Sequence, residues 1–211
     1  MKKVLILTDS LALPREKPEY CGHENTWPQL LNKHCQLHQV SLGGGTVQDL
    51  VRQLEYHKLF NPDIIIIQSG IVDCAPRALS LLELKLLQKI PFFGKRILKL
   101  VQKNSYYLRK KRKVYYTKAI LYQNSLNKIK SFFPEEDVYA LSILPSNVNY
   151  ELKVPGITKQ ISLYNEILKL KFKGNLINVQ SIPSEGIMSD YIHLNALGHS
   201  FVYESIMKAI F

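Results

Sequence analysis

A serine lies directly after the first apolar run of the chain, where it has the chemistry of a nucleophile. Residues 3–8, KVLILT, are typical of a buried strand, and Ser10 follows where that strand ends. A serine hydroxyl attacks an ester carbonyl when a neighbouring base accepts its proton. Serine is also among the best helix N-caps, so Ser10 is either a nucleophile or a cap. The G-x-S-x-G turn of the α/β-hydrolases is absent around it.

An acid and a base occur together near the C-terminus, in the segment SDYIHLNALGH. Asp190 and His193 are three residues apart. A neutral imidazole can take the proton of a hydroxyl that lies about 3 Å away. A carboxylate on the other ring nitrogen selects the tautomer and stabilises the imidazolium. One short loop could therefore supply both groups, although a single D-x-x-H pattern is weak evidence.

Two glycine-containing segments follow other apolar runs. Residues 43–45 are all glycine, and glycines between a strand and a helix expose backbone N–H groups that suit a developing oxyanion. A simple tight turn is the alternative. The segment QSGIVDCAPR follows the third run, where Asp73 and Arg77 can face the same crevice. Asp73 can equally cap the helix that follows, which is the role its position favours.

The elements that must position these residues alternate along the chain. Five apolar runs, at residues 3–8, 37–42, 63–70, 137–144 and 175–182, predict strands. Because the runs are continuous, we expect both faces of these strands to be covered. Helical patterns lie between or after them, at residues 46–60, 75–90, 157–172 and 195–211. Such alternation predicts a parallel sheet with helices on both faces, and its binding site beyond the carboxyl ends of the strands.

Taken in order, these segments resemble the four sequence blocks of the SGNH (GDSL-type) hydrolase family. The blocks are TDS at 8–10, GGT at 44–46, GIVD at 70–73 and DYIHLN at 190–195. The resemblance implies a flavodoxin-like, three-layer α/β/α sandwich with a five-stranded parallel sheet. It also implies that Ser10 is the nucleophile, His193 the general base and Asp190 its partner, and that the N–H groups of Ser10 and Gly44 form the oxyanion hole.

One position departs from the family pattern. The asparagine of the third block, whose side chain donates to the oxyanion, is replaced by Val72. Losing one such donor typically lowers the rate roughly 10²–10³-fold. Either another donor substitutes for it, or two backbone donors suffice, or the protein has little hydrolytic activity. We favour a substitute donor, with Arg77 as the first candidate, because an arginine there can also hold an anionic substrate.

Length and composition predict a single domain, and the cysteines favour a reducing compartment. The chain has 211 residues, which fits a single domain over 1–211. Its three cysteines show no paired spacing, so neither a disulfide framework nor a zinc ribbon is expected. The histidines and cysteine at 34, 35 and 38 lack a carboxylate partner, and no metal or cofactor is expected. The N-terminal run is too short for a secretion signal, so we expect a cytoplasmic protein.

The net charge of +11 comes from one segment, which we interpret as a basic helical insertion at about 84–134. That window contains 14 lysines and arginines and no acidic residue. Three interpretations remain open: a solvated helical hairpin, a surface that binds anionic membranes or a lipid-linked substrate at the inner membrane face, and a nucleic-acid interface. The last is disfavoured because no nucleic-acid-binding motif accompanies the charge.

The sequence therefore predicts a serine-dependent ester hydrolase or O-acyltransferase. The resemblance to the SGNH family implies that the substrate is an acylated carbohydrate in surface-polysaccharide metabolism, although no residue in the sequence identifies a sugar. The alternative is a glycan- or anion-binding module that keeps the hydrolase scaffold with little or no catalysis. The replacement at Val72 is the feature that supports this alternative.

Overall fold

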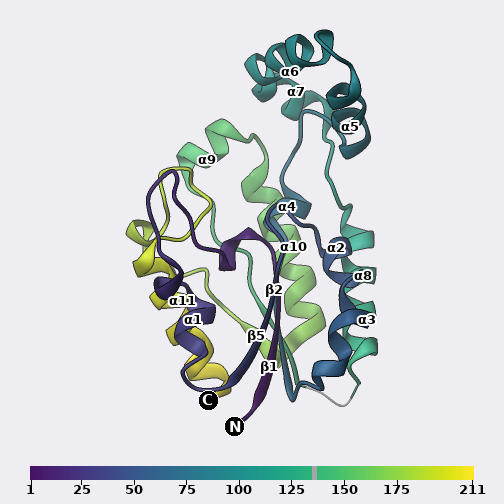
Figure 1. Cartoon of the computed structure of the whole chain (residues 1–211). Coiled ribbons are helices and arrows are strands. Elements are labelled where there is room, and N and C mark those ends of the chain that lie inside the picture. The colour runs from purple at the N-terminus through teal and green to yellow at the C-terminus, as the bar shows by residue number, and fades with distance from the viewer. Residues whose placement is uncertain (135–136) are drawn as a thin grey trace.

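A computed structural model describes residues 1–134 and 137–211 of the chain. Its centre is a five-stranded sheet in the order β2-β1-β3-β4-β5, and every neighbouring pair of strands is parallel (Figure 1). The strands are β1 (Lys3–Thr8), β2 (Gln36–Ser41), β3 (Ile64–Gln68), β4 (Asp137–Leu141) and β5 (Leu176–Ile177). The expected three-layer α/β/α sandwich with a five-stranded parallel sheet is confirmed.

The centre of the sheet is apolar on both faces because helices cover both. All five residues of β3 are buried, and five of the six residues of β1 are buried. Helices α1 (Trp27–Leu31) and α11 (Ala196–Ile210) pack together on one side, and α2 (Val47–Val51), α8 (Ala119–Phe132) and α10 (Ile157–Phe172) pack on the other. This explains why the runs of β1 and β3 are continuous rather than alternating.

The remaining helices are short or lie away from the sheet. They are α3 (Leu54–His57), α4 (Ile71–Cys74), α5 (Leu81–Lys89), α6 (Phe93–Lys103), α7 (Ser105–Arg112) and α9 (Val148–Lys153). None of the helices in the described residues is long and apolar enough to cross a membrane.

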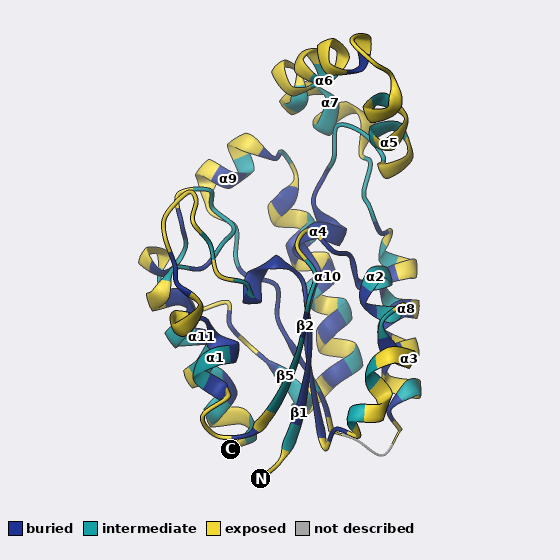
Figure 2. Cartoon of the chain, viewed as in Figure 1, coloured by how far each residue is buried: buried dark blue, intermediate teal, exposed yellow. Residues whose placement is uncertain are grey.

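The expected insertion at 84–134 divides into two parts with different roles. Helices α5, α6 and α7 form a lobe that projects beyond the body (Figure 1), and most of their residues are exposed (Figure 2). By contrast, α8 buries Tyr122, Leu126 and Ile129 and belongs to the helical layer on the sheet. We call α5–α7 the basic lobe. Two connecting segments join it to the body, and they pair where the N–H of Arg77 donates to the carbonyl of Val114.

This pairing corrects the expected helix at 75–90. Residues 75–80 do not form an α-helix, because the backbone of Arg77 is used to pair with Val114. The helix begins only after Ser80, whose side chain accepts from the N–H of Glu83 while Glu83 accepts from the backbone of Ser80. This capping box was present in the sequence as S-x-x-E.

The fifth strand is also shorter than the expected run at 175–182, with two residues in the ladder. Beyond it, the hydroxyl of Ser142 accepts from the N–H of Val179 and donates to the side chain of Asn178. Side-chain bonds therefore replace strand pairing at this edge of the sheet.

The first turn of α11 packs on backbone with no room for a side chain. A Cβ built on Gly198 would lie 2.1 Å from the carbonyl oxygen of Gly186, whereas a Cβ on Gly174 would meet nothing within 4 Å. We expect Gly198→Ala to lower the free energy of unfolding by about 1–3 kcal/mol, the usual cost of overpacking. Urea titration measures this, and Gly174→Ala should leave stability nearly unchanged. Equal stability of the two variants would contradict the close approach.

Candidate active site

Ser10 is presented by a turn that Asp9 caps. The turn is a single 3-10 helix, Ser10–Ala12, and Asp9 is its N-cap, with Oδ1 accepting from the N–H of Leu11 at 3.0 Å. Asp9 is fully buried, and burial raises its pKa to about 7. Because Asp9 is the cap, the side chain of Ser10 is not needed for capping. Ser10 is therefore not the helix cap that the sequence allowed.

The loop before α11 holds Asp190 and His193 in one hydrogen-bonded turn. Oδ1 of Asp190 accepts from the N–H groups of Ile192 and His193, both at 3.0 Å, and its Oδ2 lies 2.6 Å from Nδ1 of His193. Burial alone would raise the pKa of Asp190, but these hydrogen bonds outweigh it and hold that pKa below its ordinary value. Asp190 is therefore ionised, and His193 donates to it from Nδ1.

The other ring nitrogen of His193 faces the serine. Nε2 lies 3.0 Å from Oγ of Ser10, although the two residues are 183 positions apart in the chain. Burial lowers the pKa of His193, and Asp190 partly opposes this effect. The imidazole is therefore neutral at neutral pH and can accept the hydroxyl proton. The structure thus brings together the serine, histidine and aspartate that the sequence indicated.

Arg15 also contacts His193, and sequence reasoning did not assign it a role. Its guanidinium donates to Nε2 of the imidazole, the nitrogen that Ser10 approaches. A guanidinium only donates, so this contact requires an unprotonated Nε2 and selects the same tautomer as Asp190 does. Backbone hydrogen bonds between Arg15 and Cys21 fold the loop after Ser10 back over the site. The sequence contains no signal for that fold-back, although Arg15 is only five residues from Ser10.

Ser10, Arg15 and His193 line a cavity of about 270 Å³ at the carboxyl ends of the strands. Gly44 lies in its wall with a φ of 69°, a conformation that glycine adopts without strain. A Cβ there would point into open space, so backbone conformation rather than crowding favours glycine. Ser10 and Gly44, the two expected oxyanion donors, therefore border the same cavity.

Val72 and Arg77 lie in this cavity as well. Val72 is almost fully buried and offers no side-chain donor. The guanidinium of Arg77 donates to the carbonyl of Val72 at 3.0 Å and stacks on the ring of Tyr116, 4.4 Å from its centroid. Nε of Arg77 is buried and has no hydrogen-bond partner among the described residues. The site thus has a cationic donor group beside the position where the family pattern has an amide.

Asp73 takes neither of its two expected roles, because it lies within α4 and the helix that follows is capped by Ser80. Asp73 is fully buried and does not line the cavity. Its carboxylate accepts from the N–H of Val47 at 3.1 Å and from the hydroxyl of Ser69 at 3.1 Å. Burial raises its pKa to about 6. Asp73 therefore anchors the start of α2, which follows the glycines at 43–45, and it acts inside the fold.

The described residues contain no cluster of three or more histidine, cysteine, aspartate or glutamate side chains that could hold a metal ion. His38 instead lies 2.8 Å from His57, nitrogen to nitrogen, and stacks on Phe60. Cys35 is buried and donates to the carbonyl of Leu31. These contacts are packing at the edge strand β2.

Comparison with known proteins identifies the fold of this chain through solved structures whose sequences are only distantly similar. No family model matches the sequence, and no curated protein matches it. Among solved structures, a lipase/acylhydrolase from Enterococcus faecalis is 13% identical with a TM-score of 0.66, covering 100% of this chain and 95% of that chain. The acetyl xylan esterase AlAXEase is 15% identical with a TM-score of 0.66, covering 99% of this chain and 100% of that chain.

A member of the lipolytic G-D-S-L family from Veillonella parvula DSM 2008 is 11% identical with a TM-score of 0.61, covering 99% of this chain and 97% of that chain. The chain has the SGNH (GDSL-type) hydrolase fold. In the SGNH fold of this chain, Ser10 follows β1 and the Asp190–His193 loop precedes α11, so both lie at the same end of the sheet.

The contact of Arg15 predicts a change in the protonation of His193. The positive charge of Arg15 contributes to the lowered pKa of His193, after the larger effect of burial. Arg15→Gln removes that charge, so the pKa of His193 should rise and the ring should stay protonated up to a higher pH. An NMR titration of the His193 ring measures this. Arg52→Gln, which removes an exposed arginine paired with Asp49, is the control and should leave the midpoint unchanged. A midpoint that moves downward or stays fixed in Arg15→Gln would contradict this role.

Proposed function

We propose that this protein is a serine-dependent ester hydrolase or O-acyltransferase that acts on an acylated carbohydrate in surface-polysaccharide metabolism. The observation that carries the proposal is the line of hydrogen bonds from Oγ of Ser10 to His193 at 3.0 Å and from His193 to Asp190 at 2.6 Å. A hydroxyl, a neutral imidazole and an ionised carboxylate in that order are the parts that activate a serine for attack on an ester.

In the first half of the proposed reaction, Oγ of Ser10 attacks the ester carbonyl while Nε2 of His193 takes its proton. Asp190 stabilises the imidazolium through Nδ1. Arg15 must release Nε2 at this step, because the protonated nitrogen and the guanidinium are then both donors. Collapse of the tetrahedral intermediate breaks the bond to the alcohol, and His193 returns the proton to that leaving oxygen.

The second half releases the acyl group from Ser10. Water, or a hydroxyl of an acceptor sugar, loses its proton to His193 and attacks the acyl-enzyme, and Ser10 leaves with the proton from His193. The same residues serve hydrolysis and transfer, and the attacking hydroxyl is the difference between the two reactions.

The negative charge on the tetrahedral intermediate would be held by the N–H groups of Ser10 and Gly44, with Arg77 as a third donor. Arg77 lines the cavity next to Val72, and its Nε has no partner among the described residues. A charged donor beside the oxyanion compensates for the missing amide, whose loss would otherwise lower the rate roughly 10²–10³-fold.

A carbohydrate ester is supported by the cavity wall and by structural neighbours. Tyr116 and Tyr150 are among the residues that line the cavity. Two structures with the same fold are described as an acetyl xylan esterase and as an acetyl-xylooligosaccharide esterase from Geobacillus stearmophilus. The three cysteines of this chain are free and buried, which agrees with the proposed cytoplasmic, reducing compartment.

The contact of Arg15 with Nε2 also favours a second candidate function. A guanidinium that keeps the lone pair of His193 occupied would leave Ser10 without a base. The protein would then bind glycans or anions in the cavity without turnover. The two candidates differ in whether Ser10 is nucleophilic.

Labelling with a fluorophosphonate probe separates them. We expect the wild-type chain to be labelled on Ser10, Ser10→Ala to be unlabelled, and Ser131→Ala, which removes a serine of α8 outside the site, to be labelled normally. Arg77→Ala should be labelled at least tenfold more slowly, since it removes the proposed third donor. No labelling of the wild type, beside an active serine hydrolase that is labelled, would favour the binding module. Equal rates for Arg77→Ala and the wild type would exclude Arg77 from the oxyanion hole.

A further inference from the structure

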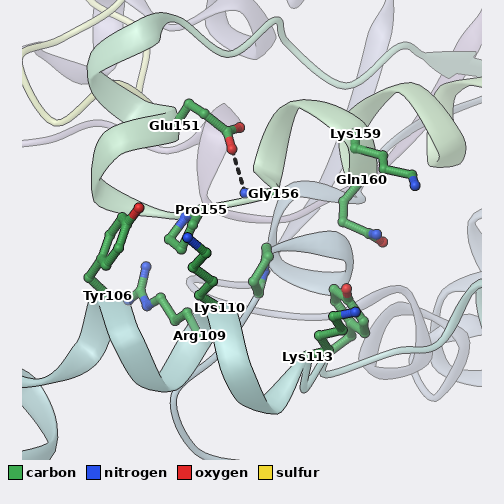
Figure 3. A pocket seen from close by; sticks show the side chains of 11 residues that line it. Tyr106, Arg109, Lys110, Lys113, Glu151, Pro155, Gly156, Lys159 and Gln160 are labelled. Atoms are coloured by element: carbon green, nitrogen blue, oxygen red, sulfur yellow. Dashed lines mark hydrogen bonds between the residues drawn. The ribbon is translucent and has the colours of Figure 1, made fainter.

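A second cavity, of about 500 Å³, lies between the basic lobe and the body. Helix α7 contributes Tyr106, Arg109 and Lys110 to it, Lys113 follows at the end of that helix, and Lys159 comes from α10. In Figure 3 the side chains from α7 and from α10 are arranged around one space. Four cationic residues from two separate parts of the fold therefore line this cavity.

The carboxylate in the wall, Glu151, forms no ion pair with these cations within the described chain and offsets only one of the four positive charges. Glu151 accepts hydrogen bonds from the N–H of Gly156, drawn in Figure 3, and from the N–H and hydroxyl of Thr158 at 2.9 and 2.7 Å. Its oxygens are thus used to hold the start of α10. Among the described residues, no ion pair joins Glu151 to Arg109, Lys110 or Lys159.

Arg109 is the least satisfied of the four cations. Its Nε is buried without a hydrogen-bond partner in the described part of the chain. Burial lowers its pKa, and the positive charge of Arg77 lowers it further. Two guanidinium groups near each other in a partly buried site repel, and an oxyanion placed between them and the lysines would relieve that repulsion.

The two cavities are neighbours. Pro76, Tyr115 and Glu151 line the larger one, and the residues adjacent to them in the chain, Arg77, Tyr116 and Tyr150, line the cavity of Ser10. The two cavities are therefore separated by only three short stretches of chain.

We propose that the basic cavity binds an acidic group, a phosphate or a carboxylate, on the same molecule whose ester lies at Ser10. The substrate would then be an acylated sugar that carries a sugar phosphate or a uronic acid. This rests on the proposed function for the position of the ester, but the anion site itself does not require catalysis. Arg109 provides a planar pair of donors, and the lysines add charge around it.

The test measures binding in Ser10→Ala, so that it is independent of turnover. Calorimetric titration with glucose 1-phosphate, glucuronate, inorganic phosphate and uncharged glucose compares the acidic groups. We expect one of the two acidic sugars to bind at least tenfold more tightly than glucose, with an affinity that falls as salt is added. The stronger of the two identifies the preferred acid.

Matched variants locate the site. Lys110→Gln with Lys159→Gln removes two cations from the cavity and should weaken binding of the acidic sugar at least tenfold. Lys128→Gln with Lys169→Gln removes the same charge from exposed positions on α8 and α10 and should leave it unchanged. Equal weakening in both pairs, or no preference for either acidic sugar over glucose, would overturn the proposal. Fluorophosphonate labelling that fails while anion binding persists would remove the proposed catalysis alone.

A different observation concerns the outer surface of the basic lobe. Exposed apolar side chains repeat at helical spacing: Leu82 and Leu86 on α5 are 68% and 54% exposed, and Phe93, Ile97 and Leu100 on α6 are 67%, 39% and 61% exposed. Residues three and four positions apart lie on one face of a helix. Each helix therefore has an apolar stripe that is exposed in the described part of the chain, and Figure 2 shows that both helices are largely exposed.

Basic residues form a parallel stripe on each of these helices. Lys85 and Lys89 are four apart on α5, and Lys95, Lys99 and Lys103 are four apart on α6. A helix with an apolar stripe beside a lysine stripe is typical of segments that lie in the interface of an anionic membrane. Each basic residue near such a surface adds to the electrostatic attraction.

We infer that the basic lobe docks on an anionic lipid surface. A second copy of the chain is a poorer partner, because two lobes of the same strong positive charge repel. The lobe lies beyond the carboxyl ends of the strands, where the site is (Figure 1). Docking would therefore place the catalytic cavity near the membrane, where a lipid-linked sugar would be within reach.

Flotation with lipid vesicles tests this inference. The wild-type chain should float with vesicles that contain one third phosphatidylglycerol, less so at high salt, and should not float with pure phosphatidylcholine. Phe93→Ser with Leu100→Ser should reduce the bound fraction at least tenfold. Leu163→Ser with Leu170→Ser, which changes two exposed leucines of α10, should not. Equal flotation of both pairs, no flotation of the wild type, or self-association in sedimentation velocity that only the lobe variant abolishes would overturn it.

Discussion

The hydrogen bond between Ser10 and His193 depends on the parallel arrangement of the whole sheet. Ser10 follows β1 in the centre, and the loop of His193 follows the last strand and precedes α11. Because all the strands run in the same direction, their carboxyl ends meet at one edge, and loops from both ends of the chain reach the same cavity. The hydrogen bond of 3.0 Å between Ser10 and His193, which are 183 positions apart in the chain, therefore forms only when the whole α/β/α body is assembled.

Three arginine side chains lie near the hydrogen bond between Ser10 and His193. Arg15 contacts the imidazole, Arg77 lies beside Val72, and Arg109 lies in the neighbouring cavity close to Arg77. Cations stabilise a developing oxyanion but oppose the formation of an imidazolium on His193. An acidic group on the substrate would resolve this conflict, because it would neutralise part of the charge while the ester is bound.

The body of the chain contains the buried core, whereas the basic lobe is mostly exposed surface. The core is complete without α5–α7, since α8 supplies the buried contacts on that side of the sheet. The lobe instead carries exposed leucines, a phenylalanine and lysines at regular spacing, held to the body by the pairing of Arg77 with Val114. The exposed residues of the lobe are therefore not constrained by packing in the core.

The sequence by itself determined the fold class and the residues at the ends of the strands. Continuous apolar runs require covered strands, and Ser10, Asp190 and His193 are recognisable because short local patterns contain them. The tertiary structure alone decided the role of Arg15, the burial of Asp73 and the division between α8 and the lobe. Each of these depends on which distant segments come into contact. Local spacing contains no information about that, because it follows from how the loops fold back over the assembled sheet.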